Sequence, residues 1–316
     1  MPRRAFQCPY GPFLFGVLAP LIAAYAQQDF SQVEIDARAV AGSVYMLTGA
    51  GGNIGVSAGE EGILIVDDQY APLADKIRKA LSDIAGPDAP VRFVLNTHYH
   101  GDHTGGNEAF QQQHGATVIA HDNVRERLAS GGTAGNRAGI AFEFPASPSA
   151  ALPVVTFHER VVIHINGEQV RASHIAHGHT DGDAVVYFAE ANVVHMGDNF
   201  VTYGFPFIDL ASGGSIDGMI ETTEHVLATL PDDVKVIPGH GNLSTPDDLR
   251  AFLSMLHGAR AAVVTAIDAG LTPDQMKAQG ILSPWQEWDR GFIKADGFID
   301  TLYNDLTTET EDHGHH

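Results

Sequence analysis

Four potential metal ligands lie within six residues of the stretch Asn96-Thr97-His98-Tyr99-His100-Gly101-Asp102-His103. Imidazole and carboxylate groups together suit zinc and similar divalent ions. The residues Arg92-Phe93-Val94-Leu95 just before the stretch, with three apolar residues in a row, are typical of a buried strand. In the extended chain that follows, the first two histidines point to the same side, and a glycine-rich turn redirects the aspartate and the last histidine. The stretch therefore predicts a strand-end loop that supplies ligands to two neighbouring metal ions.

The composition is that of an ordinary folded protein with an acidic surface. The 316 residues are 44% hydrophobic and 18% charged, enough for one large domain or two fused halves. Acidic residues outnumber basic ones by 39 to 18. Because nucleic-acid binding depends on Lys and Arg that replace counterions, we expect a small-molecule substrate and no nucleic acid. Nothing in the composition predicts the oligomeric state.

Residues 1–26 have the pattern of a signal peptide. Arg3 and Arg4 form a positive start, residues 13–24 are apolar, and Ala24-Tyr25-Ala26 offers a cleavage site before Gln27. The apolar run is too short for a convincing membrane span, so we expect no stable membrane anchor after cleavage. The alternative is an uncleaved amphipathic N-terminus. Cleavage would remove the single cysteine, and the mature protein is expected to be periplasmic or secreted, without a disulfide.

The next part of the chain alternates short apolar runs with turns. Strands are expected at 44–48, 53–57, 62–66, 92–95 and 117–120, and helices at 71–85 and about 106–113. Residues 129–153 are rich in Gly, Ala, Ser and Pro and show little periodicity. Such a segment either forms a wall of a binding site or makes a plain surface excursion.

A second series of strands and helices follows. Strands are expected at 154–157, 161–165, 169–176, 184–188, 192–196 and 234–237, and helices at 215–230 and 246–268, the last capped by Thr245. This double succession favours two sheets packed together with helices outside. From Leu271 two helical segments with several aromatic residues are expected to pack on the body, and the last residues are expected to fray.

Three further candidate ligands stand beside glycines at the ends of expected strands. His179 follows Gly178, Asp198 follows Gly197, and His240 lies between Gly239 and Gly241. Glycine at such positions allows tight turns and a close approach of the backbone to an ion. Each turn alone is more often an ordinary polar loop than a ligand, so these residues carry weight only together.

The combined order His-x-His-x-Asp-His, His, Asp, His resembles the metallo-beta-lactamase superfamily, over roughly residues 33–252. The resemblance implies an α+β fold, a four-layer αβ/βα sandwich with a C-terminal helical extension. It divides the chain into a signal peptide at 1–26, a catalytic domain at 27–268 and a helical extension with a frayed tail at 269–316. It also implies a metal-dependent hydrolase.

The resemblance implies a site with two zinc ions, although iron or manganese would also suit the ligands. The first ion would be held by His98, His100 and His179, and the second by Asp102, His103 and His240. Asp198 would bridge the two ions together with a hydroxide. His177 competes for the role of His179, but the family's Gly-His-Thr signature favours His179. Asp67 matches a strand-end aspartate of the family that supports the ligands from behind.

The implied reaction is attack by the metal-bridging hydroxide on an amide, ester or thioester. Asp102 is the candidate catalytic residue, because it could orient the hydroxide or shuttle its proton. Metal ions lower the pKa of their bound water and polarise the carbonyl. The chain offers no Gly-x-Ser-x-Gly elbow and no cysteine after processing, so a covalent mechanism has little support.

Two departures from the best-known di-zinc beta-lactamases bear on the substrate. Asp198 stands where those enzymes have Cys, and Val201 stands where they have a Lys for the carboxylate of the drug. We therefore expect weak or promiscuous beta-lactam hydrolysis. The alternatives are a lactonase or a hydroxyacylglutathione-hydrolase-like thioesterase and, in a different class, a persulfide dioxygenase with a single iron. Tyr203 is a possible substrate contact, with packing as its simpler role.

Overall fold

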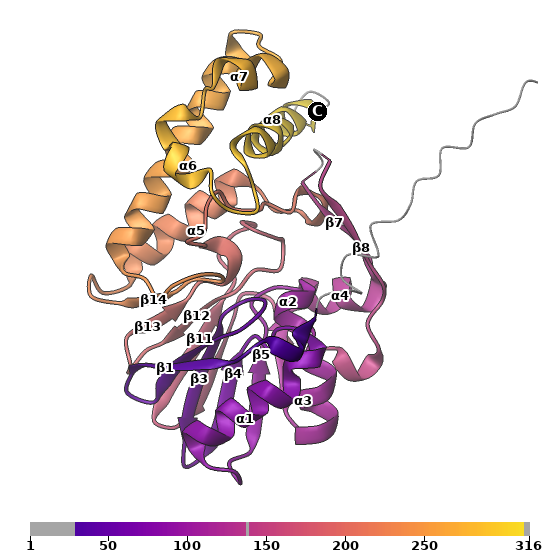
Figure 1. Ribbon diagram of the computed structural model, residues 1–316, viewed down its shortest axis with the longest axis vertical. Helices are drawn as coiled ribbons and strands as arrows, with labels where there is room; N and C mark the ends of the chain where they lie inside the picture. Colours follow the sequence, from indigo (N-terminus) through magenta and orange to yellow (C-terminus); the bar gives the residue numbers. More distant parts are fainter. Residues whose placement is uncertain (1–28, 137–138, 313–316) are drawn as a thin grey trace, which may run out of the picture.

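The computed structural model describes residues 29–136 and 139–312 (Figure 1). The expected signal peptide at 1–26 and the last residues, 313–316, lie outside this part of the chain. In the described ranges, no helix combines the length and the apolar character that crossing a membrane requires.

Twelve strands of the described residues form two large sheets. The first has the order β1-β2-β3-β4-β5-β6-β9, with antiparallel pairs up to β4 and parallel pairs from β4 onward. Its strands are β1 Asp36–Ala41, β2 Val44–Thr48, β3 Ile54–Gly59, β4 Gly62–Val66, β5 Val91–Leu95, β6 Thr117–His121 and β9 Val155–Phe157. The second has the order β10-β11-β12-β13-β14, and only β13 and β14 pair in parallel. Its strands are β10 Arg160–Ile165, β11 Glu168–Ser173, β12 Val185–Phe188, β13 Val193–His195 and β14 Lys235–Ile237.

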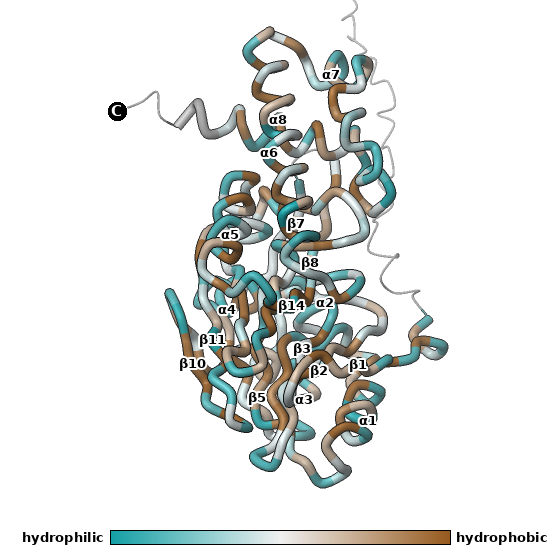
Figure 2. Tube along the Cα trace, turned by 90° about the vertical axis from the view of Figure 1, so that its left-hand side faces the viewer, coloured by the Kyte–Doolittle hydropathy of each residue, from teal (hydrophilic) through white to brown (hydrophobic). Residues whose placement is uncertain are grey.

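The two sheets pack face to face, and helices cover their outer faces (Figure 1). Strand β4 shows how the sequence builds these layers. Leu64 and Val66 face the second sheet, whereas Ile63 and Ile65 face helix α1, Ala74–Ala85. This alternation follows from the period of two in a strand, and Figure 2 shows the apolar stretches along β2, β3 and β5. The four-layer αβ/βα sandwich expected from the sequence is confirmed.

The helices begin and end where the sequence has capping signals. Helix α5, Ile216–Thr229, starts after Ser215, whose side chain accepts a hydrogen bond from the backbone N–H of Gly218. Helix α6, Pro246–Asp268, starts after Thr245 with a capping box closed by Asp248. The remaining α-helices are α2 Gly101–Thr104, α3 Asn107–His114, α4 Asp122–Ser130, α7 Pro273–Gln279 and α8 Ala295–Asp312.

The C-terminal helices pack on α5 and α6 through one apolar cluster. Phe298 and Leu302 of α8 and Met276 of α7 are buried in it. Figure 1 shows α7 and α8 at the end of the molecule away from α1. The backbone N–H of Ile216, at the start of α5, donates to the Asp305 carboxylate on α8. The expected packing of the aromatic C-terminal residues on the body is found for Phe298, which is fully buried.

Residues 129–153 are more regular than the sequence suggested. Helix α4, Asp122–Ser130, ends inside this range, and β7 Gly132–Gly135 pairs with β8 Ala141–Phe144 in a separate two-stranded sheet. The prediction of an irregular segment was wrong here because three of the four residues of β7 are Gly or Ala, which have little strand propensity of their own. Pairing with β8 and contacts with residues 209–212 hold β7 in place.

Candidate metal centre

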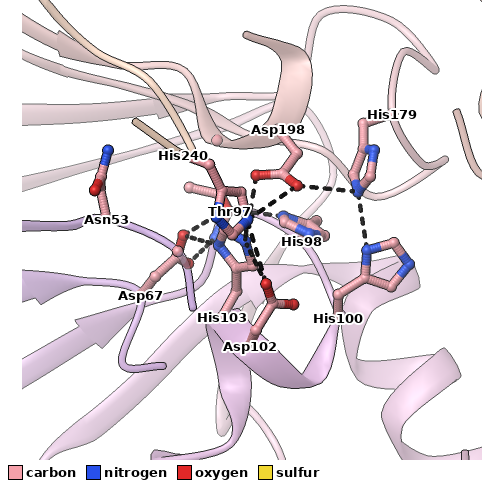
Figure 3. A network of polar contacts seen from close by, with 12 residues as sticks. Asn53, Asp67, Thr97, His98, His100, Asp102, His103, His179, Asp198 and His240 are labelled. Carbon is pink, nitrogen blue, oxygen red and sulfur yellow. Dashed lines mark hydrogen bonds and ion pairs between the residues drawn. The ribbon is translucent and has the colours of Figure 1, made fainter. Parts of the chain in front are cut away.

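All seven candidate ligands meet at one edge of the sandwich, where strands of both sheets end (Figure 3). The stretch 98–103 follows β5, and its reversal is the single helical turn α2. His179 precedes β12, Asp198 follows β13, and His240 follows β14. Parallel strands deliver their carboxyl ends to the same edge, which is why residues so distant in sequence converge.

Three overlapping groups of these side chains have ligand atoms close enough to hold a metal ion. The first ligand group is His98, His100 and His179, and the second is Asp102, His103 and His240; a further set, His98, His103 and Asp198, overlaps both. Within each group all ligand atoms lie within 4.8 Å of one another. The first and second groups are the two ligand sets that the family resemblance implied. The structure thus brings together every residue proposed as a ligand.

In the first group, two ring nitrogens face each other at short distance. The Nε2 of His179 lies 2.9 Å from the Nδ1 of His100. The opposite nitrogen of His179 is 2.8 Å from the carbonyl oxygen of Phe207, and that of His100 is 3.0 Å from the Asp209 carboxylate. Since those oxygens only accept, a neutral ring donates its N–H there and turns its lone pair toward the other ring. A cation between them removes this repulsion.

His98 has the same arrangement. Its Nδ1 lies 3.0 Å from the hydroxyl of Thr97, and that hydroxyl donates to Asp67, so it accepts from the His98 ring. The Nε2 of His98 is buried and has no hydrogen-bond partner among the described residues. An orphaned buried nitrogen lacks the interaction it would have in water. A metal ion supplies that missing interaction.

The second group mixes carboxylates with imidazoles. The Nε2 atoms of His103 and His240 are 3.3 Å apart, and the Asp102 carboxylate lies 3.2 Å from the Nε2 of His240. Asp198 reaches both groups: its Oδ1 is 3.2 Å from the Nε2 of His103, and its Oδ2 is 3.8 Å from the Nε2 of His179. Asp198 therefore lies between the two groups, where the family resemblance implied a ligand shared by both.

The electrostatics of the two groups differ. Burial lowers the pKa of His98 well below its usual value, and burial also lowers the pKa of His179 to about 4. Burial acts the same way on His240, but the Asp198 and Asp102 carboxylates outweigh it and raise the pKa of His240 to about 10. Without an ion, protons balance the carboxylates of the second group, whereas the first group offers neutral donors. Both groups suit a divalent cation in place of those protons.

Glycines at the site allow the backbone to approach the ligands closely. A Cβ on Gly52 would overlap the ring of His103, and a Cβ on Gly239 would overlap the Asp198 carboxylate. The N–H of Gly52 also donates to the carbonyl of Asp102 at 3.0 Å. The glycine-rich turn at 49–52 thus supports the ligands directly.

Asp67 lies behind His103, as the sequence predicted. Its carboxylate accepts hydrogen bonds at 2.7 Å from the backbone N–H and the hydroxyl of Thr97, and it lies 2.7 Å from the Nδ1 of His103. The residue is fully buried and has a left-handed φ of 66°. Since this one carboxylate accepts from two groups of Thr97 and from the Nδ1 of His103, it fixes both the ring of His103 and the start of the ligand loop.

Replacing Asp67 with asparagine should lower metal affinity or kcat by about 10- to 100-fold, because the amide nitrogen cannot accept and would face one of these three donors. Metal titration and steady-state kinetics measure the effect. Asp75, exposed on α1, provides the matched control, and Asp75→Asn should behave as the wild type. Equal behaviour of the two variants would remove Asp67 from the support of the site.

One supporting residue was missed by the sequence analysis. Asp209 is fully buried and accepts hydrogen bonds from Tyr99 Oη at 2.6 Å and from the N–H of Gly135 at 2.7 Å, while holding His100. It stands 109 residues from His100 in the chain, and no spacing links the two. The one available signal was a charged residue inside an otherwise apolar run at 205–210.

The structure also distinguishes His179 from His177, which competed for the same ligand role in the sequence. His177 is exposed and belongs to none of the three ligand groups, so His179 takes the position that the family signature favours. Asp183 accepts hydrogen bonds from the N–H groups of His179 and Thr180, a turn role that also fixes the ligand. Tyr203 has its ring 5.8 Å from that of His240, at the rim of the second group.

Comparisons with known proteins agree with this arrangement. The profile of the metallo-beta-lactamase superfamily matches residues 47–240. A hydroxyacylglutathione hydrolase from Polaromonas sp. is 31% identical over 147 residues, 46% of this chain and 47% of that protein. Another from Pelagibacter ubique is 27% identical over 150 residues, 48% of this chain and 52% of that protein. The chain spans about half the length of these two relatives.

A solved metallo-beta-lactamase from Pontibacter korlensis superposes with a TM-score of 0.58 at 19% identity. The match covers 71% of this chain and 99% of that one. At this identity the likeness shows the fold.

Proposed function

Because the chain belongs to the metallo-beta-lactamase superfamily, we propose that it is a metal-dependent hydrolase that cleaves an amide, ester or thioester bond of a small molecule. The membership confirms the resemblance seen in the motifs. The observation that carries the proposal is the close approach of the Nε2 of His179 to the Nδ1 of His100, 2.9 Å apart, with Asp198 extending to the second group. A site without a cation would leave the lone pairs of these two nitrogens in repulsion.

We propose two divalent ions, zinc first, with iron or manganese as alternatives that the nitrogen and oxygen ligands would also accept. Such ions would supply Lewis acidity toward a carbonyl oxygen and a nucleophile derived from water at neutral pH. The protein contributes the ligand geometry, which Thr97, Asp209 and Asp67 fix by holding the far side of each ring.

Asp102 is the proposed proton acceptor. Its side chain is 24% exposed, whereas that of Asp198 is 10% exposed, so Asp102 is the carboxylate at the open side of the site. Its Oδ2 faces the Nε2 of His240 at 3.2 Å. Asp102 could accept the proton of an attacking water and pass it to solvent, while the less exposed Asp198 would serve as a metal ligand.

The substrate is proposed to carry no carboxylate that a lysine must bind. Val201 is 1% exposed and lies in a parallel bridge with His240, so this position points into the protein. The sequence 202–218 contains no Lys or Arg. We therefore propose a lactone or a thioester as the preferred substrate class and beta-lactams as weak substrates; relatives named hydroxyacylglutathione hydrolase support the thioester.

A panel of a glutathione thioester, a lactone, a penicillin and a carbapenem tests the proposal. Loss of a charged hydrogen bond to the lactam carboxylate predicts kcat/KM on the beta-lactams roughly 10- to 150-fold below that of dedicated beta-lactamases that have the lysine, and the best lactone or thioester should be the preferred substrate. Beta-lactam turnover equal to that of dedicated enzymes would contradict this preference. Oxygen consumption with glutathione persulfide, and no hydrolysis, would instead favour the dioxygenase alternative.

A further inference from the structure

Three phenylalanines from distant parts of the chain gather beside the first ligand group. Phe142 lies on β8, Phe207 precedes the 3-10 turn at 210–212, and Phe292 lies between the 3-10 segment at 283–288 and α8. The ring centroids are 6.4 Å apart for Phe142 and Phe207, and 6.3 Å apart for each of the other two pairs. These separations are typical of interacting aromatic rings, so the three side chains form one apolar wall.

The wall begins at the metal centre. The ring of Phe207 lies 6.0 Å from that of His100 and 5.9 Å from that of His179. The carbonyl of Phe207 also holds the Nδ1 of His179. A substrate whose scissile bond reaches the first ligand group therefore has neighbouring atoms within reach of these rings.

The outer part of the wall is open to solvent. Phe292 is 59% exposed and is the one aromatic residue among the large exposed hydrophobic side chains of the described residues. Phe142 and Phe207 are partly exposed. An exposed apolar cluster next to a reactive centre is typical of a ligand-binding surface, because its contact with an apolar part of the ligand is favourable.

The backbone holds Phe292 in this place. Its neighbour Ile293 is 1% exposed and forms an antiparallel bridge with Phe205, whose N–H donates to the carbonyl of Trp288 at 3.0 Å. Neighbouring side chains of an extended segment alternate, so burial of Ile293 turns Phe292 outward. On the other side, the Asn136 amide donates to the hydroxyl of Thr301 on α8 at 3.1 Å, which fastens the β7–β8 hairpin to the C-terminal helix.

We propose that Phe142, Phe207 and Phe292 bind the apolar acyl or ring portion of the substrate, so that the C-terminal segment takes part in substrate selection. This inference rests on the proposed hydrolase function and names the substrate class more narrowly: a neutral acyl compound with an extended hydrocarbon part. Phe142 and Phe292 are specificity residues, and neither contributes a ligand atom to the three metal-binding groups.

Kinetics on matched ester or thioester pairs, hexanoyl against acetyl, test the inference. In Phe292→Ala, kcat/KM for the hexanoyl substrate should fall roughly 5- to 30-fold, mainly through KM, because part of a phenyl contact is lost. The acetyl substrate should change by less than about twofold. Phe142→Ala should act in the same direction. Val162→Ala, which removes another exposed apolar side chain on β10, should leave both substrates unchanged.

A binding measurement separates this inference from the hydrolase proposal. By titration calorimetry, the wild type should bind hexanoate about 10-fold more tightly than acetate, and Phe292→Ala should lose that preference. If the preference is present but no acyl substrate is hydrolysed, the function is wrong and the apolar site stands. If hydrolysis is present and both Phe variants keep the hexanoyl preference, the apolar site is wrong. An equal fall in kcat/KM on the hexanoyl and acetyl substrates would also overturn the inference. So would Phe variants that change only the self-association of the protein.

Discussion

Replacing Asp198 with alanine is expected to lower kcat/KM on every hydrolysed substrate by more than about 1,000-fold, equivalent to about 4 kcal/mol of transition-state stabilisation. The reason lies in its position between the groups, with Oδ1 3.2 Å from His103 and Oδ2 3.8 Å and 3.5 Å from His179 and His240. Alanine leaves the imidazoles on both sides without the shared negative charge. The bound metal should fall below two ions per chain together with activity.

The control for this variant is Asp232→Ala. Asp232 is a surface carboxylate, 91% exposed at its side chain and paired with Arg250, so the same chemical change occurs far from a buried site. Its effect on kcat/KM should stay within about twofold, as for most surface substitutions. Circular dichroism checks that both variants fold. Full activity in a folded Asp198→Ala protein would remove Asp198 from the site.

Removing the metal with a strong chelator should abolish hydrolysis and lower Tm by roughly 5 °C. The loss of activity follows from the proposed chemistry. The loss of stability follows because the lone pairs of His100 and His179 again face each other at 2.9 Å and the Nε2 of His98 again lacks a partner. A ligand that binds only the folded state stabilises that state by mass action.

Zinc added back to the chelated protein should restore both activity and Tm. Asp198→Ala provides a matched comparison, since its weaker ion binding predicts a smaller shift in Tm on chelation. Unchanged activity and Tm after complete metal removal would show that the facing nitrogens are stabilised in some other way.

The sequence predicted much of the fold because the signals were local. A continuous apolar run marks β4, and alternating apolar and polar residues mark the end of β10. Thr245 followed by Pro246 and Asp248 marks the start of α6. Hydrophobic period and capping chemistry act over a few residues, so they can be read without the fold. The hairpin β7–β8 could not be read this way because its first strand depends on its partner and on Asp209.

The ligands and one supporting residue, Asp67, were predicted from short motifs and the family resemblance, whereas the supports of His100 and His179 were not. His98 to His103 form a compact motif, whereas the partner of His100 is Asp209, more than a hundred residues away, and that of His179 is the backbone carbonyl of Phe207. Such contacts arise only when the loops of both sheets meet at one edge. The aromatic wall escaped prediction in the same way, since Phe142, Phe207 and Phe292 share no sequence pattern.

The central claim is a centre for two divalent ions, and metal quantification on the purified protein tests it most directly. Elemental analysis per chain should find close to two ions, zinc first among them, in wild-type protein that hydrolyses a lactone or thioester. A single iron per chain, with oxygen consumption on a persulfide, or a fully active protein with no bound metal, would contradict the account.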